Sequence, residues 1–222
     1  IKAELKNNAR IIKADITYFN FAEINNIAAR KSDTPYILLL NNDVKIKDKD
    51  SISELRSWCA KDEVGAVGAK LFYEDGSIQH AGINFLPIRP ANMRDENYFS
   101  HIVRETDAVT FAMAMLKRRA YQDVGELDAF NCPSGFGDTL FCHELKKKSW
   151  RTIFTPYATG IHYESKSRGS QPEEVELLEM VQAGLPIADL FSDFSAEKQP
   201  MLLSLGGIRT SKLFRLVKKI IK

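Results

Sequence analysis

A carboxylate directly follows a short apolar run in the first quarter of the chain. Residues 36–40 are Tyr-Ile-Leu-Leu-Leu, and Asn41, Asn42 and Asp43 come next. Such a run, bounded by turn formers, is typical of a strand buried on both faces, as in a parallel sheet. Asp43 would then lie beyond the carboxyl end of the strand, where open α/β sheets bind ligands. Its carboxylate suits Mg²⁺ or Mn²⁺ carrying a diphosphate, but the three polar residues taken alone favour a plain turn.

Two helices are predicted by capping patterns on either side of this run. Asn20 with Glu23 forms a capping-box pattern for residues 20–31, whose apolar side chains recur at helical spacing. Ser51 with Glu54 repeats the pattern for a second helix. The apolar residues expected to face inward from that helix are Ile52, Leu55 and Cys59.

Further strands and helices follow along the chain. Asp75-Gly76 between apolar residues is a strong hairpin signal. Strands are predicted over 64–71, 107–116 and 153–154, the last ended by Pro156, and helices over 118–124 and 138–148. Because strands and helices alternate at first and strands cluster later, the fold class is α/β with a mixed sheet flanked by helices.

Composition excludes several classes of protein. The 222 residues carry a net charge of +2, which argues against a nucleic-acid binder, and 44% of them are hydrophobic. No apolar run reaches the roughly 18 residues that span a membrane. Three cysteines without a C-x-x-C pair fit reduced thiols in a cytoplasmic protein. The first residue is Ile1 rather than Met, so we expect a piece of a longer polypeptide.

Several stretches match one protein family in order and spacing. The matching stretches are Asn20-Phe21 with Asn25-Asn26, residues 39–43, 75–82 and 108–110, Asp138 with Phe141-Cys142, and residues 155–158 and 162–169. On these residues the chain resembles the family 2 glycosyltransferases of bacterial cell-surface polysaccharide synthesis, in particular rhamnosyltransferase-like members. The resemblance covers residues 7–170 and leaves out the tail.

The resemblance implies a GT-A fold, a UDP- or dTDP-sugar donor, a divalent metal (Mn²⁺ or Mg²⁺) and inversion at the anomeric carbon. It also implies a glycan or lipid-linked acceptor in O-antigen or cell-wall synthesis. The family normally begins with a strand and helix that grip the nucleotide base, and these are not found in residues 1–222. We therefore expect an upstream domain or a partner chain to cover the exposed edge of the sheet.

The resemblance implies catalytic and donor-binding roles for individual residues. Asp43 occupies the position of the family's metal-binding carboxylate. Asn41 and Asn42 would hold the ribose or orient the Asp43 side chain by hydrogen bonds. Asp138 stands at the general base; its ordinary pKa, about 4, would leave it ionised to take the acceptor's proton. The alternative reading of Asp138 is a helix N-cap.

Other polar residues complete the expected site. His162 occupies the position where the family has a metal ligand or a diphosphate contact. The alternative is a histidine with a structural role only. Lys166 and Arg168 would close over the diphosphate, or form a solvated loop. Gln79 and His80 would lie on the acceptor side, or at a polar strand edge.

The tail after the resemblance is a separate region, so the expected division is 1–170 and 171–222. Residues 212–222 place apolar side chains on one face and basic side chains on the other. Such a helix can lie on an anionic membrane surface, which would hold the protein at the inner face of the membrane. Docking of the helix on a protein domain is the alternative.

Two functions are therefore predicted. The first is an active, metal-dependent, inverting glycosyltransferase. The second is a degenerate module that binds a glycan or a partner enzyme without catalysis. Phe111, Gly137 and Leu140 depart from the family pattern and favour the second function. A phenyl ring at 111 would fill a pocket that the family keeps open with glycine.

Overall fold

The computed structural model describes residues 10–83 and 98–163. In these residues a seven-stranded mixed sheet forms the middle layer, in the order β1-β6-β3-β7-β2, with β4 on β3 and β5 on β7. The strands are β1 (Tyr36–Leu40), β2 (Val44–Ile46), β3 (Val64–Phe72), β4 (Ile78–His80), β5 (Arg104–Glu105), β6 (Met113–Lys117) and β7 (Arg151–His162). The α/β class with a mixed sheet is therefore confirmed.

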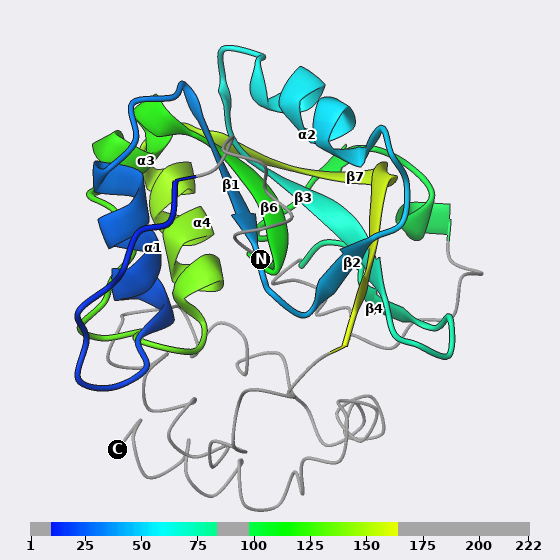
Figure 1. Cartoon of the computed structure of the whole chain (residues 1–222). Coiled ribbons are helices and arrows are strands. Elements are labelled where there is room, and N and C mark those ends of the chain that lie inside the picture. Colours follow the sequence, from blue (N-terminus) through cyan, green and yellow to red (C-terminus); the bar gives the residue numbers. More distant parts are fainter. Residues whose placement is uncertain (1–9, 84–97, 164–222) are drawn as a thin grey trace, which may run out of the picture.

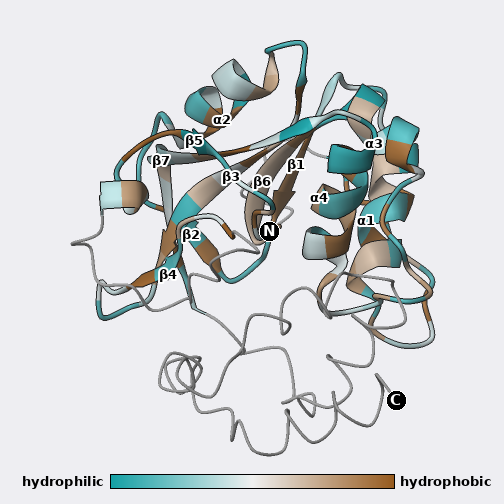
Figure 2. Cartoon of the chain, turned by 180° about the vertical axis from the view of Figure 1, so that it is seen from behind, coloured by the Kyte–Doolittle hydropathy of each residue, from teal (hydrophilic) through white to brown (hydrophobic). Residues whose placement is uncertain are grey.

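Helices cover both faces of the sheet (Figure 1). Three of them, α1 (Phe21–Arg30), α3 (Arg118–Val124) and α4 (Gly137–Lys147), lie on one face. Helix α2 (Ser51–Cys59) lies on the other, and a short 3-10 turn spans Tyr98–Ser100. Figure 2 shows hydrophobic residues concentrated on the central strands, between these helical layers.

Local sequence signals place α1 and α3 correctly. The Asn20 side chain accepts a hydrogen bond from the Glu23 amide at 2.9 Å, so the predicted N-cap is confirmed. The Glu23 carboxylate faces Arg30 on the same helix instead of closing a capping box. Gly125 ends α3 with a φ of 95°, a left-handed conformation that glycine adopts without a Cβ clash.

The predicted cap of α2 is wrong. Asp50 occupies the N-cap position, and Ser51 is a buried residue inside the helix. The Ser51 hydroxyl accepts a hydrogen bond from the Thr159 amide at 3.0 Å, while the Glu54 carboxylate accepts one from the Thr155 hydroxyl at 2.6 Å. Both side chains therefore tie α2 to β7. Ile52, predicted to face inward, is 43% exposed, whereas Leu55 and Cys59 are buried as predicted.

Strand β1 is apolar on both faces but is not a buried parallel strand. It pairs antiparallel with β6 and is the terminal strand of the described sheet. Ile37 and Leu39 pack against the α1 side, and Tyr36 and Leu38 against the α2 side. Leu40 is 41% exposed. Apolar packing on two faces thus explains the run, while its pairing direction depends on β6, far along the chain.

Strand β7 is longer than predicted. It pairs parallel with β3, and Pro156 does not end it. The register jumps from Ala69↔Thr155 to Lys70↔Thr159, so residues 156–158 lie outside regular pairing. Proline, which has no amide hydrogen, is tolerated at such an irregularity. In contrast, the strand predicted over 107–116 is shorter: β6 begins at Met113, and the residues before it form a loop.

The core is divided by the sheet into two hydrophobic clusters. One joins β6 to α1, α3 and α4, and the other joins β3 to α2. Cys59 lies in the α2 cluster and Cys142 in the α4 cluster, and Cys132 is also buried. Burial raises the pKa of both Cys59 and Cys142 to about 12, so these thiols stay protonated.

Candidate functional site

The polar residues after β1 meet the end of β7 at one edge of the sheet. Val44 pairs with His162, and the Tyr163 amide donates a hydrogen bond to the Asp43 carbonyl at 2.9 Å. The Asn41 amide donates to the Ala112 carbonyl at 2.9 Å, which anchors the turn to the loop before β6. Asn42 is exposed on this turn. The structure therefore brings together residues that lie more than a hundred positions apart.

The side chains of Asp43 and His162 face one another. The Asp43 Oδ1 and His162 Nε2 atoms are 3.2 Å apart, and the two side chains are 17% and 12% exposed. Oδ1 is buried and has no hydrogen-bond partner in the described chain, so this contact lacks the geometry of a hydrogen bond. An unsatisfied buried carboxylate oxygen is costly and signals a missing donor or cation. The pair therefore fits two ligands of one divalent metal.

The described residues provide no larger set of metal ligands. Within 10–83 and 98–163, no group of three or more His, Cys, Asp and Glu side chains is arranged to hold a metal ion. A metal at Asp43 and His162 would need its remaining ligands from the substrate or from water. Lys166 and Arg168, expected to contact the diphosphate, lie outside the described residues.

Two amide side chains complete the surroundings of His162. Gln79 Oε1, on β4, is 2.7 Å from His162 Nδ1, and Asn41 Nδ2 is 3.5 Å from Nε2. Gln79 is 9% exposed. The contact between Gln79 and His162 is not predictable from a local sequence pattern, because the residues are 83 positions apart. The predicted acceptor-side role of Gln79 stays a prediction.

Asp138 lies at the start of α4 but does not cap the helix. Phe136 occupies the N-cap position with a φ of 54°, and Asp138 is the second helical residue. Its carboxylate accepts hydrogen bonds from the Thr139 amide at 2.7 Å and the Phe111 amide at 3.3 Å. The N-cap alternative is therefore wrong. The side chain instead joins α4 to the loop before β6, the loop that also holds Asn41.

The pKa of Asp138 is not that of an ordinary aspartate. Burial raises the pKa above its usual value, against hydrogen bonds from Thr139, Phe111 and Thr110 that favour the charged form. A carboxylate whose pKa is closer to neutral pH is a stronger base than an exposed one. Thr110, which the family match included without a role, is thus a neighbour of Asp138 that the sequence did not assign.

Two of the three departures from the family pattern, Phe111 and Leu140, lie in the core. Phe111 is 1% exposed, and its ring packs on Phe141 with centroids 5.7 Å apart. The ring therefore lies in the hydrophobic core, and its effect on an acceptor pocket stays a prediction. Leu140 is also buried. A Cβ on Gly137 would lie 3.3 Å from the Cys132 carbonyl oxygen, a tight contact that favours glycine there.

His80 is a buried neutral histidine. Its Nε2 accepts hydrogen bonds from the Gly82 amide at 3.1 Å and the Thr110 amide at 3.4 Å. Burial, helped by the charge of Arg104, lowers the pKa of His80 to about 3. The side chain thus joins the turn after β4 to the loop that contacts Asp138. Its predicted acceptor-side role stays a prediction.

Protonation of His80 should make the protein less stable in mild acid. In the unfolded chain, His80 takes up a proton below its pKa of about 6.5. In the folded chain, His80 stays neutral down to about pH 3, so stability falls as pH falls from about 6.5 to 3. Between pH 7.5 and 5 this costs about 2 kcal/mol. We expect the loss in wild type to exceed that in His80→Gln by this amount, measured by urea unfolding at both pH values. Parallel pH dependence in the two proteins would contradict the assignment.

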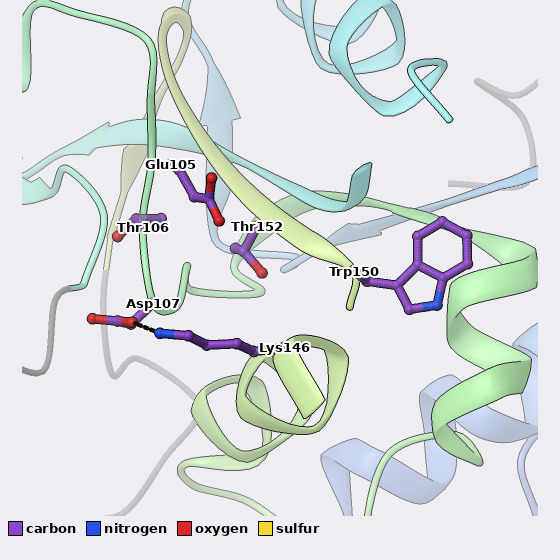
Figure 3. Close-up of a pocket in the computed structure, with 6 residues that line it drawn as sticks. All are labelled: Glu105, Thr106, Asp107, Lys146, Trp150 and Thr152. Carbon is purple, nitrogen blue, oxygen red and sulfur yellow. Dashed lines mark hydrogen bonds and ion pairs between the residues drawn. The ribbon is translucent and has the colours of Figure 1, made fainter. Parts of the chain in front are cut away.

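A polar hollow is lined by other residues of the described chain. It has a volume of about 290 Å³ and is lined by Glu105, Thr106, Asp107, Lys146, Trp150 and Thr152. Figure 3 shows Lys146 reaching across to Asp107, and their charged atoms are 2.8 Å apart. None of the predicted site residues lines this hollow.

Two curated proteins are similar to the chain in sequence. It is 32% identical over 168 residues to the uncharacterized protein y4gI of Sinorhizobium fredii (strain NBRC 101917 / NGR234), covering 71% of this chain and 18% of that protein. It is 32% identical over 164 residues to the O-antigen biosynthesis protein RfbC of Myxococcus xanthus, covering 68% and 12%. The chain thus spans less than a fifth of either relative. No family model matches it.

Two solved structures, of GalNAc-T7 and TarS, have a similar fold. GalNAc-T7 with UDP, GalNAc and Mn²⁺ has a TM-score of 0.56 and 13% identity, with 89% of this chain and 40% of that chain covered. Residues 1–349 of Staphylococcus aureus TarS with UDP-GlcNAc have a TM-score of 0.52 and 12% identity, with 90% and 64% covered. The mixed sheet flanked by helices is therefore a GT-A fold.

Among residues 10–83 and 98–163, no helix is both long and apolar enough to cross a membrane.

Proposed function

We propose that the chain is the catalytic part of an inverting glycosyltransferase of bacterial surface-polysaccharide synthesis. It would move a hexose from a UDP- or dTDP-sugar to a glycan or lipid-linked acceptor. The observation that carries the proposal is the half-buried pair of Asp43 and His162, 3.2 Å apart at the sheet edge of a GT-A fold, with the buried Asp43 Oδ1 lacking a hydrogen-bond partner in the described chain. The Mn²⁺ and UDP of GalNAc-T7 and the UDP-GlcNAc of TarS support a donor of this class.

Asp43 and His162 would hold the divalent metal together with oxygens of the diphosphate. When bound, the metal would neutralise charge on the leaving diphosphate. A mixed carboxylate and imidazole pair suits Mn²⁺ better than Mg²⁺, because imidazole is softer than the oxygen ligands that Mg²⁺ prefers. Asn41 and Asn42 lie on the same turn, where they would contact the donor.

Asp138 would be the general base. In a single displacement, its carboxylate takes the proton from the acceptor hydroxyl as the oxygen bonds to the anomeric carbon and the nucleoside diphosphate leaves. Inversion needs no nucleophile from the enzyme. The Phe111 and Thr139 amides hold the carboxylate in place, and its raised pKa suits it to accept a proton.

Binding and transfer assays test the proposal directly. Calorimetry of the protein with UDP-, dTDP- and GDP-sugars, each with and without Mn²⁺, should show one donor class that binds only with metal. Transfer to oligosaccharide and lipid-linked acceptors should then follow, with inverted configuration of the product by NMR. Glycan binding without donor binding in any of these assays would instead support the non-catalytic module.

The setting of the enzyme belongs to the same proposal. A cytoplasmic location suits a consumer of nucleotide sugars, and residues 212–222, outside the described residues, would provide contact with an anionic membrane surface. An upstream domain or partner chain beside β1 remains part of this proposal, because β1 is the terminal strand of the described sheet.

A further inference from the structure

We infer that Gln79 is a positioning residue that fixes the tautomer of His162, with the proton on Nδ1 and a lone pair on Nε2, the nitrogen that lies 3.2 Å from Asp43 Oδ1. The inference rests on the proposed metal-dependent function, because it explains how His162 becomes a ligand. It gives Gln79 a part in donor binding that differs from contact with the acceptor.

The first observation is the contact on the far side of the ring. Gln79 Oε1 is 2.7 Å from His162 Nδ1, a short hydrogen-bond distance. A carbonyl oxygen accepts and cannot donate, so Nδ1 must carry the hydrogen. In a neutral imidazole the other nitrogen, Nε2, is then the acceptor. Histidine ligands commonly have their tautomer set in this way, by the hydrogen bond that the other nitrogen makes.

The second observation lies on the near side of the ring. Asn41 Nδ2, an amide donor, is 3.5 Å from Nε2, at the limit of a hydrogen bond. Its chemistry agrees with a lone pair on Nε2, since two donors would repel one another. Gln79 and Asn41 come from β4 and the turn after β1, so two independent elements favour the same tautomer.

The third observation is the orphaned oxygen of Asp43. With the proton on Nδ1, Nε2 and Asp43 Oδ1 face each other as two acceptors 3.2 Å apart, and Oδ1 has no hydrogen bond from the described chain. Two lone pairs at this distance are unfavourable unless a cation binds both of them. With a hydrogen on Nε2 instead, that nitrogen would have no lone pair to offer a metal.

Gln79 is held firmly enough to impose this choice. It lies on β4, whose three residues are all buried, and the strand pairs with β3. The next residue, His80, is fixed by the Gly82 and Thr110 amides. The amide of Gln79 therefore reaches His162 from a rigid element instead of a loop, which is the arrangement that positions ligands well.

Nitrogen NMR of the metal-free protein reads the tautomer without an activity assay. A long-range ¹H–¹⁵N spectrum with ¹⁵N-labelled histidine at pH 8 resolves the four histidines, and His162→Ala identifies the signals of His162. We expect a protonated Nδ1 and an unprotonated Nε2 in wild type. Gln79→Glu, which keeps an acceptor oxygen, should preserve this pattern, whereas Gln79→Leu should lose it. Gln122→Leu, an exposed residue of α3, is the matched control.

Mn²⁺ titration by electron paramagnetic resonance in the presence of UDP gives the second readout. Gln79→Leu should weaken Mn²⁺ affinity by roughly 10–100-fold, the usual effect of removing an outer hydrogen-bond partner of a ligand. Gln79→Glu should remain close to wild type. Unchanged signals of His80, His101 and His143 verify the fold of each variant, and the wild-type spectrum decides the tautomer even if Gln79→Leu does not fold.

The outcomes separate this inference from the proposed function. Protonation of Nε2 in wild type, as the other tautomer or as imidazolium, overturns the inference even if Mn²⁺ binds with UDP. Unchanged tautomer and Mn²⁺ affinity in Gln79→Leu overturn it as well. If wild type shows the expected tautomer, and Gln79→Leu loses it, but no variant binds Mn²⁺, the positioning role of Gln79 stands and the metal-dependent function fails.

Discussion

Replacement of Asp138 by Asn is expected to lower turnover by roughly 10²–10⁴-fold, the usual contribution of a general base. The amide keeps the shape of the carboxylate but cannot accept the acceptor's proton at neutral pH. Donor affinity should change little, because the carboxylate of Asp138 is hydrogen-bonded to Thr110, Phe111 and Thr139 and is not one of the proposed metal ligands. Transfer kinetics and donor calorimetry on the same preparations measure the two effects separately.

The pH profile gives an additional check on Asp138. Burial raises its pKa, so the rate should fall as pH decreases through a value above that of an ordinary aspartate. Asp33→Asn, an exposed carboxylate in the loop before β1, is the matched control and should keep full activity. Full transfer activity in Asp138→Asn would remove Asp138 from the mechanism.

Replacement of Asp43 by Ala is expected to weaken Mn²⁺ binding in the presence of UDP by more than about 100-fold. Loss of a residue that only hydrogen-bonds to a metal ligand typically costs roughly 10–100-fold in affinity, and loss of a ligand itself should cost more. Asp43 is one of the two metal ligands proposed among the described residues, and its Oδ1 has no hydrogen-bond partner there. Donor affinity should fall as well, because the proposed metal would hold the diphosphate. Wild type should bind Mn²⁺ weakly without nucleotide, since one carboxylate and one imidazole make a poor site alone.

Calorimetry of Mn²⁺ with and without UDP or dTDP compares wild type, Asp43→Ala and Asp48→Ala. Asp48 is an exposed carboxylate near the start of α2, so its removal controls for the loss of charge. Equal Mn²⁺ affinity of wild type and Asp43→Ala in the presence of nucleotide would exclude this carboxylate as a ligand.

Features set by neighbouring residues were predictable from the sequence. The Asn20 cap, the Asp75-Gly76 hairpin and the Gly125 helix end each depend on a few adjacent positions, and all are present. Ser51 and Pro156 were misread because their positions depend on distant segments. Ser51 bonds to Thr159, and Pro156 lies where β7 leaves its register with β3.

In the candidate site, the residues themselves were predictable, but their long-range contacts were not. The family resemblance selected Asp43 and His162, and the structure places them in contact across 119 positions of sequence. The partner of Gln79 could not be predicted, because no pattern on β4 refers to the end of β7. The pKa of Asp138 could not be predicted either, since it depends on burial by a loop that the sequence suggested was a strand.

The thiols of Cys59 and Cys142 can report local unfolding of the helical layer that covers each of them. Cys59 and Cys142 lie on opposite faces of the sheet, and each thiol stays protonated while its face is closed. An alkylating reagent attacks only the thiolate, so its rate at each cysteine counts how often that face separates from the sheet. Peptide mass spectrometry after timed alkylation would therefore show whether the α2 layer and the α4 layer detach together or independently.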